Sequence, residues 1–154
     1  MRSAGTCFAL GALVAALSVT PARAQSPVFI EYAVTGTATA SGRDADVVLC
    51  SVSEGQLTIH TMGTWVFDFE GTTAEPGEHD AAIRIAAPES FTALHDTDLR
   101  TDDHLSGTAK LVISSAGRGQ ANTPLLRVRF TADSLTSEIG AHAKVTGTLV
   151  CPVM

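Results

Sequence analysis

Lysine is almost absent from this chain of 154 residues, in which only Lys110 and Lys144 occur. The 16 acidic residues outnumber the 10 basic ones, and the formal net charge is −6 at pH 7. A chain with so little positive charge repels nucleic-acid phosphates and anionic membrane surfaces. We therefore expect no nucleic-acid partner, and we interpret the acidic composition as a means of staying soluble.

Long apolar runs are also missing. The longest one, residues 8–19, is too short for the roughly 20-residue helix that crosses a bilayer. It follows Arg2 and precedes small residues that end at Ala24, which is the pattern of a signal peptide cleaved before Gln25. We expect residues 1–24 to be removed during export and residues 25–154 to form a single domain. That domain would be periplasmic or extracellular, with no membrane span after cleavage.

Cysteine is scarce, and the chain contains no C-x-x-C pair. Cys7 lies inside the predicted signal peptide, ahead of the apolar run, whereas a lipoprotein signal carries its cysteine after that run. Cys50 and Cys151 remain in the exported region, where an oxidising compartment favours disulfides. We predict a disulfide bond between them. A redox or metal-binding pair is the alternative, and the spacing disfavours it.

The exported region shows no amphipathic helical pattern of useful length. Its clearest alternation places Trp65, Phe67 and Phe69 on one face of a strand, which we expect to face the core. Similar short segments recur with turns about every 10 residues, as is typical of an antiparallel β-sandwich or barrel. We predict an all-β fold, an immunoglobulin-like or related β-sandwich of about eight strands, with a small β-barrel as the alternative. The expected strands span residues 28–34, 47–53, 56–62, 64–70, 81–87, 106–115, 125–132 and 142–151, and residues 71–80 are an expected loop.

Two segments resemble a known family. Val47–Ser51, followed by Gly55–Ile59, is similar to an early strand–turn–strand of the mycobacterial nineteen-kilodalton lipoprotein antigen family. Phe130–Ala132 and Val145–Cys151 resemble the last two strands of that family, which also end in a cysteine. The resemblance implies a small secreted β-rich domain with one disulfide and no known catalytic residues. The chain departs from the family because it has no lipobox for a lipid anchor.

Catalytic motifs are missing too. The chain has no G-x-S-x-G elbow and no S-x-x-K motif, the local signatures of two classes of serine enzyme. We therefore predict that the protein is not an enzyme and that it binds a protein, a surface polymer or a small ligand. A lipocalin-like carrier of an apolar ligand, held inside a small barrel, is one alternative.

One segment concentrates side chains that can bind metals. Carboxylates suit divalent cations, and imidazoles suit zinc or copper. The EF-hand spacing is absent, however, and aspartates are also common in solvated turns. A periplasmic metal-binding protein that uses loop 95–104 is therefore a further hypothesis, and apart from such a divalent metal we expect no cofactor. The candidate ligands are His95, Asp96, Asp98, Asp102, Asp103 and His104.

A second arrangement combines an imidazole with a thioether. Strand alternation places His60 and Met62 on the same face, an arrangement that copper-binding proteins of the periplasm also use. Met62 is the only methionine between the two ends of the chain, so a site with several methionines cannot form. We expect both side chains to lie on the outer face of a hairpin.

A third arrangement is a pair of arginines on one strand. Arg127 and Arg129 share the outer face of that strand and could bind a carboxylate or phosphate. We expect them instead to pair across the sheet with acidic residues such as Asp68 or Glu70.

Overall fold

The protein folds as one antiparallel sheet. The computed structural model describes residues 27–37, 39–88 and 104–154. In these ranges the sheet has nine strands in the order β2-β1-β9-β8-β7-β6-β5-β4-β3. The strands are β1 (Phe29–Gly36), β2 (Ala40–Ala45), β3 (Val48–Ser53), β4 (Gln56–Thr61), β5 (Val66–Thr73), β6 (Gly77–Ala86), β7 (Leu105–Arg118), β8 (Pro124–Thr136) and β9 (His142–Pro152). A 3₁₀ turn at Gln120–Asn122 is the only helical segment of the described chain, and no helix there could span a membrane.

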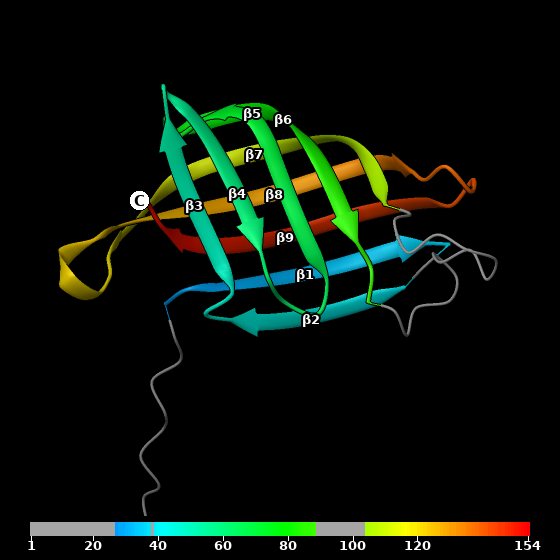
Figure 1. Cartoon of the computed structure of the whole chain (residues 1–154), viewed down its shortest axis with the longest axis horizontal. Helices are drawn as coiled ribbons and strands as arrows, with labels where there is room; N and C mark the ends of the chain where they lie inside the picture. Colours follow the sequence, from blue (N-terminus) through cyan, green and yellow to red (C-terminus); the bar gives the residue numbers. More distant parts are fainter. Residues whose placement is uncertain (1–26, 38, 89–103) are drawn as a thin grey trace, which may run out of the picture.

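The sheet curls into a half-barrel. Figure 1 shows β3–β6 passing steeply across β7, β8, β9 and β1, so that the two halves of the sheet face each other. Irregular pairing between β7 and β8, and between β8 and β9, interrupts the ladder where the long strands bend, as β-bulges do. The all-β prediction is confirmed. A sandwich of two separate sheets is not confirmed, because β6 and β7 join the halves through a continuous ladder, and the barrel-like alternative is compatible.

The observed strands agree with the predicted ones where apolar and polar side chains alternate in the sequence. They differ from the predicted ones elsewhere. The structure has nine strands, whereas about eight were expected, and the additional one is β2. Its sequence is poor in β-branched and aromatic residues, and its pairing with β1 compensates for this. The expected loop at 71–80 is also wrong, because β5 continues to Thr73 and β6 begins at Gly77. The turn Glu54–Gly55 does form, with positive φ at both residues, as a type I′ hairpin turn requires.

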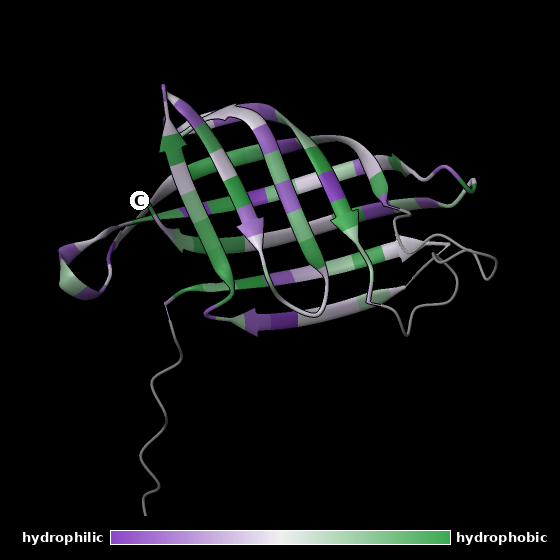
Figure 2. Ribbon diagram, viewed as in Figure 1, coloured by the Kyte–Doolittle hydropathy of each residue, from purple (hydrophilic) through white to green (hydrophobic). Residues whose placement is uncertain are grey.

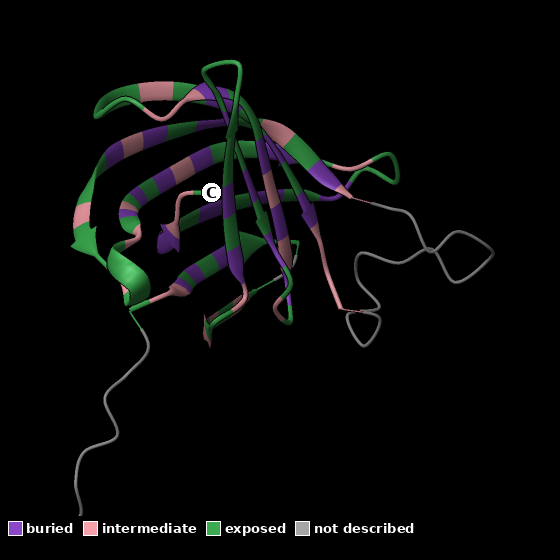
Figure 3. Ribbon diagram, turned by 60° about the vertical axis from the view of Figure 1, so that its left-hand side comes forward, coloured by how far each residue is buried: buried purple, intermediate pink, exposed green. Residues whose placement is uncertain are grey.

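The inner side of the curled sheet is filled by side chains. Buried residues alternate with exposed ones along most strands (Figure 3), and the hydropathy of the strands alternates in the same way (Figure 2). Trp65, Phe67 and Phe69 are 0–2% exposed, so the predicted core face of the segment 64–70 is confirmed. The aromatic rings contact each other across the interior of the curled sheet. The centroid of the Phe67 ring lies 5.1 Å from that of Tyr32 in β1 and 5.9 Å from that of Phe130 in β8. These rings hold the two halves of the sheet together.

A glycine makes room for these rings. Gly147 of β9 lies between Tyr32 and Phe130 in the ladder. A Cβ atom there would come within 2.3 Å of the Phe130 ring and 2.4 Å of the Glu31 carbonyl oxygen. Because real Cβ atoms do not approach other atoms so closely, only glycine leaves room for the Phe130 ring beside β9.

The two edges of the sheet are fastened in different ways. At one edge, Cys50 of β3 forms the predicted disulfide with Cys151 of β9, with Cα atoms 5.8 Å apart. Beside it, the backbone of Met154 donates to Cys50 and accepts from Val52, so the chain end covers part of this edge. At the other edge, a carboxylate oxygen of Asp44 in β2 accepts a 3.1 Å hydrogen bond from the backbone N–H of Thr64.

Candidate functional site

The outer face of β4–β7 gathers polar and charged side chains. These four strands follow one another in sequence and pair as an antiparallel meander. Their inward positions are buried and mostly apolar, with Thr61 and Thr72 as buried polar exceptions, so alternation directs the charged residues outward. The outward residues include Asp68 and Glu70 of β5, Asp80 and Arg84 of β6, and Lys110 of β7.

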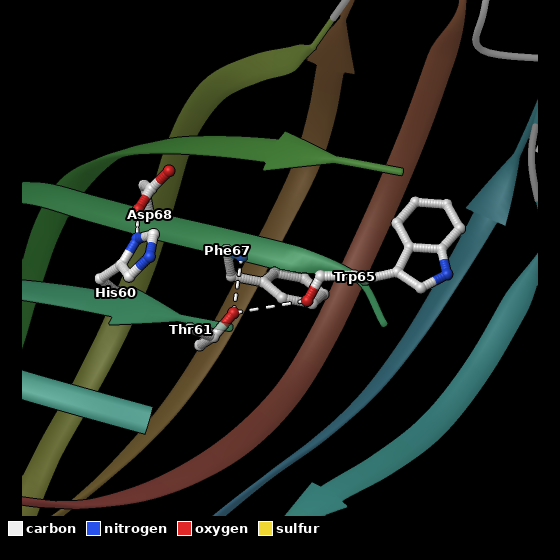
Figure 4. A network of polar contacts seen from close by, with 5 residues as sticks. All are labelled: His60, Thr61, Trp65, Phe67 and Asp68. Atoms are coloured by element: carbon white, nitrogen blue, oxygen red, sulfur yellow. Dashed lines mark hydrogen bonds and ion pairs between the residues drawn. The ribbon is translucent and has the colours of Figure 1, made fainter. Parts of the chain in front are cut away.

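A histidine–aspartate pair lies at one end of this face. His60 of β4 and Asp68 of β5 are partners in the ladder, and the Nδ1 atom of His60 is hydrogen-bonded to a carboxylate oxygen of Asp68 (Figure 4). An ionised carboxylate can only accept, so Nδ1 is the donor. The pair lies at the surface, with 46% of the His60 side chain and 35% of the Asp68 side chain exposed.

Thr61 fixes the strand positions beneath this pair. Its side chain points inward and is fully buried. The hydroxyl oxygen accepts a 2.8 Å hydrogen bond from the backbone N–H of Phe67 and lies 3.4 Å from the carbonyl oxygen of Trp65, to which it donates (Figure 4). These bonds join the end of β4 to the start of β5. They therefore hold His60 and Asp68 opposite each other.

The polar row continues across the sheet beyond Asp68. In the ladder, Asp68 faces Arg84 of β6, and Arg84 faces Ser106 of β7. His60 and Ser106 are separated by two intervening strands, which amounts to about 14 Å at the usual strand spacing. The row therefore does not assemble His60, Asp68 and Ser106 into a nucleophilic triad, whose members must be within hydrogen-bond reach.

Three shallow cavities lie side by side on β5–β7. The first, of about 300 Å³, is lined by Asp68, Glu70, Ala82, Ile83, Arg84, Ser106 and Gly107. The second, of about 430 Å³, shares Glu70 and Ala82 with it and extends to Asp80 and Thr108. The third, of about 380 Å³, shares Asp80 with the second and reaches Glu78, His79, Lys110 and Val112. Neighbouring cavities share lining residues, so they lie in a row along the outer face. We call this row of cavities the β5–β7 groove.

Charge in the β5–β7 groove is unevenly distributed. Its lining carries four carboxylates and two cations, Arg84 and Lys110. Arg84 lies opposite Asp68 in the ladder, and Lys110 lies opposite Asp80. Glu70 instead lies opposite Ala82, and Glu78 lies opposite Val112, so these two carboxylates have no cation as a ladder partner on those strands. The groove therefore favours cationic groups and hydrogen-bond donors.

The arginine pair of β8 does not contact the predicted acidic residues. Arg127 faces Ser114 of β7 and Val150 of β9, and Arg129 faces Val112 and Thr148. The expected partners Asp68 and Glu70 belong to β5, which β6 and β7 separate from β8. The predicted pairing is wrong because it depended on strand order, which alternation within single strands does not reveal.

Most of the other predicted site residues lie outside the described part of the chain. The signal-peptide junction Ala24–Gln25 lies outside the described residues, as do the candidate metal ligands His95, Asp96, Asp98, Asp102 and Asp103. The last candidate ligand, His104, is described and half-buried just before β7. Among the described residues, no three or more His, Cys, Asp or Glu side chains are grouped so that they could hold a metal. Metal binding by loop 95–104 stays a prediction.

Comparison with known proteins gives no match to a protein-family model, to a curated protein or to a solved structure. The resemblance to the nineteen-kilodalton lipoprotein antigen family stays a prediction. The β5–β7 groove was not anticipated from the sequence, although Asp68 and Glu70 were considered as acidic residues on the outer face of the sheet. The sequence does contain one signal for this groove, which is the run of consecutive predicted strands that became β4–β7. Consecutive strands commonly pair with each other, so their outward polar residues could have been expected to lie side by side.

Proposed function

We propose that this protein is an exported, non-enzymatic binding domain that holds its partner on the outer face of β5–β7. The single observation that carries this proposal is the location of the β5–β7 groove on the outside of a sheet whose inside is occupied by its own core. Phe67, Phe69, Phe130 and Leu149 are at most 2% exposed on the inner side. Export is supported by the disulfide, because oxidising compartments favour such bonds.

The partner is best matched by a protein or polymer segment that bears amino or guanidinium groups. Glu70 and Glu78 offer carboxylates that no cation faces in the ladder. Thr108 and Ser106 add hydroxyl groups along the same groove. Charge complementarity of this kind favours the orientation and rate of encounter, and an extended segment can lie along cavities that share their lining residues.

The alternatives have less support. A lipocalin-like carrier needs an open interior, and the interior of this sheet holds the contacts between Tyr32, Phe67 and Phe130. Metal binding by loop 95–104 stays a separate hypothesis. The substitutions His95→Ala and Asp102→Ala should each abolish a stoichiometric metal if that hypothesis holds.

The proposal is tested by NMR titration of isotope-labelled protein with an oligolysine peptide. We expect amide shifts to concentrate on β5, β6 and β7. The double substitution Glu70→Gln with Glu78→Gln should weaken binding by about twofold or more, because exposed charge pairs are each worth about 0.2–1 kcal/mol.

The matched control removes the same charge far from the groove, through Glu54→Gln in the β3–β4 turn and Glu138→Gln in the β8–β9 loop. We expect the control to bind the peptide nearly as tightly as the wild type. Equal weakening in both double variants would mean that net charge, not the groove, attracts the peptide, and the proposal would be wrong.

A further inference from the structure

The tautomer of His60 leaves one ring nitrogen ready to bind a metal ion. Because Asp68 holds the Nδ1 hydrogen, the neutral imidazole carries its lone pair on Nε2. Histidine ligands of metal ions characteristically donate their other ring N–H to a carboxylate, which fixes the ring orientation and increases the basicity of the ligand. Asp68 accepts the Nδ1 hydrogen of His60 in the same way as the carboxylate that supports a metal-binding histidine.

A soft ligand follows at the next outward position of the chain. The backbone N–H of Met62 donates to the carbonyl oxygen of Val47 at 2.8 Å, so β-type pairing continues one residue past the end of β4. Thr61 points inward, and Met62 consequently points outward on the side of His60, with 57% of the residue exposed. Residues two apart on a strand have Cα atoms about 6.7 Å apart, a separation that the imidazole and the flexible thioether can bridge around one ion.

We propose that His60 and Met62 form a binding site for a soft monovalent cation, Cu(I), with Asp68 as the positioning residue. The ligands would be Nε2 of His60 and the thioether sulfur of Met62, and Cu(I) accepts low coordination numbers. Thioether sulfur selects soft Cu(I) over hard divalent cations. Zinc sites need three or four nitrogen, sulfur or oxygen ligands, and the described residues offer no group of three His, Cys, Asp or Glu side chains.

The surroundings of the pair fit this assignment. Leu49 of β3 is the ladder partner of His60 and is 38% exposed, so an apolar side chain borders the site on one side. Met62 does not line any of the three cavities of the β5–β7 groove. Asp68 does line the first cavity, so the metal site borders the groove. The Met62→Leu variant alters no residue of the groove, and it therefore separates failure of the metal site from failure of the proposed partner-binding function.

The experiment measures binding of Ag(I), an air-stable stand-in for Cu(I), and then of Cu(I) itself in competition with a chromogenic Cu(I) chelator under anaerobic conditions. The protein used is the chain without residues 1–24, with its disulfide intact. We expect one ion per chain, with shifts of the Met62 methyl and His60 ring signals in NMR spectra. Met62→Leu should weaken binding by at least about tenfold, and Asp68→Asn by about 10- to 100-fold, as loss of supporting carboxylates does elsewhere.

Matched controls use the other exposed residues of the same types. Met154→Leu and His142→Gln alter an exposed methionine and an exposed histidine outside the site, and Asp80→Asn removes an outer-face carboxylate. All three should bind Ag(I) like the wild type. The ¹⁵N shifts of the His60 ring provide a second readout, because Asp68→Asn should change the tautomer balance, which loss of stability alone would not do.

The proposal is wrong if the wild type binds no Ag(I), or if Met62→Leu binds as tightly as Met154→Leu. Zinc binding that matches Ag(I) in affinity and depends on the same residues would also overturn it, because a thioether contributes little to a zinc site. Retained binding in both Met62→Leu and His60→Gln would place the ion elsewhere. None of the substituted side chains belongs to the buried core, so we expect all these variants to fold.

Discussion

Thr61 is a polar residue at a position where the alternation of β4 places the core, and it is fully buried. Burying a hydroxyl without a partner costs free energy, and Thr61 avoids this cost through hydrogen bonds with the backbone of Trp65 and Phe67. The same bonds set the position of β5 against β4. A single threonine thus supports the placement of the aromatic core on one face of the sheet and of the His60–Asp68 pair on the other.

Tyr32 is the residue for which the structure predicts a pH effect. Burial raises the pKa of its hydroxyl above the ordinary value of 10.0, and the negative charge of Asp44 raises it further. The folded state therefore binds the phenolic proton more tightly than the unfolded state does. Its contribution to stability is fully present below pH 10 and is lost as the pH rises through the higher folded-state pKa.

We accordingly expect the free energy of unfolding to fall above about pH 10 more steeply in the wild type than in the variant Tyr32→Phe. Urea unfolding between neutral pH and pH 11 measures this difference. Tyr32 is the only tyrosine of the chain, so phenolate absorbance follows its titration directly. A midpoint at or below that of free tyrosine would contradict the prediction.

The strand β2 depends on contacts with neighbouring segments. It is a short edge strand with unfavourable β propensity, paired on one side with β1. Arg43 supports it from the outer face through an ion pair with Glu31 at 3.1 Å and by stacking over the Phe29 ring at 3.7 Å. On the inner side, Asp44 reaches across to Thr64. These contacts stabilise β2 as a strand, although its sequence has a low propensity for β structure.

The substitution Asp44→Ala should weaken the attachment of β2 to the segment that contains Thr64. Loss of the hydrogen bond to the Thr64 N–H should cost about 1 kcal/mol, and the effect should be local. We expect faster amide hydrogen exchange within β2, with little change in β8. Ser41→Ala, at an exposed position of the same strand, is the control that should leave exchange unchanged, and a uniform increase across the sheet would refute a local role.

At the scale of the whole molecule, the curled sheet is held closed by contacts between segments far apart in the chain. The disulfide joins β3, at one edge of the sheet, to β9, and its two cysteines are 101 residues apart. The aromatic contacts join β5 to β1 and β8. The disulfide and the aromatic contacts therefore link β3 and β5 to β1, β8 and β9, which are strands that run across each other in Figure 1.

Removing the disulfide should therefore destabilise the entire fold. For a loop of about 100 residues, the chain-entropy model gives a loss of about 4.7 kcal/mol. We expect the double variant Cys50→Ala with Cys151→Ala to unfold at a markedly lower urea concentration than the oxidised wild type. The reduced wild type is the comparison that separates loss of the bond from loss of the sulfur atoms. Equal midpoints for all three proteins would show that the bond does not stabilise the fold.

Much of this architecture follows from the sequence because it depends on local periodicity. Alternation places Trp65, Phe67 and Phe69 inside, and it places Asp68 and Arg84 outside. The pairing of Cys50 with Cys151 follows by elimination, once Cys7 is assigned to the predicted signal peptide. These inferences need only the two-residue period of a strand and a count of cysteines, so no knowledge of strand order is required.

Other features were decided by tertiary structure alone. Strand order separated Arg127 and Arg129 from the acidic residues of β5. Pairing with β1 made a strand of β2. Register brought His60 to Asp68 and aligned the residues that line the β5–β7 groove. The physical reason is that alternation states only which face of a strand a residue occupies. Which residues become neighbours across strands is decided by how the whole sheet curls to bury its aromatic core.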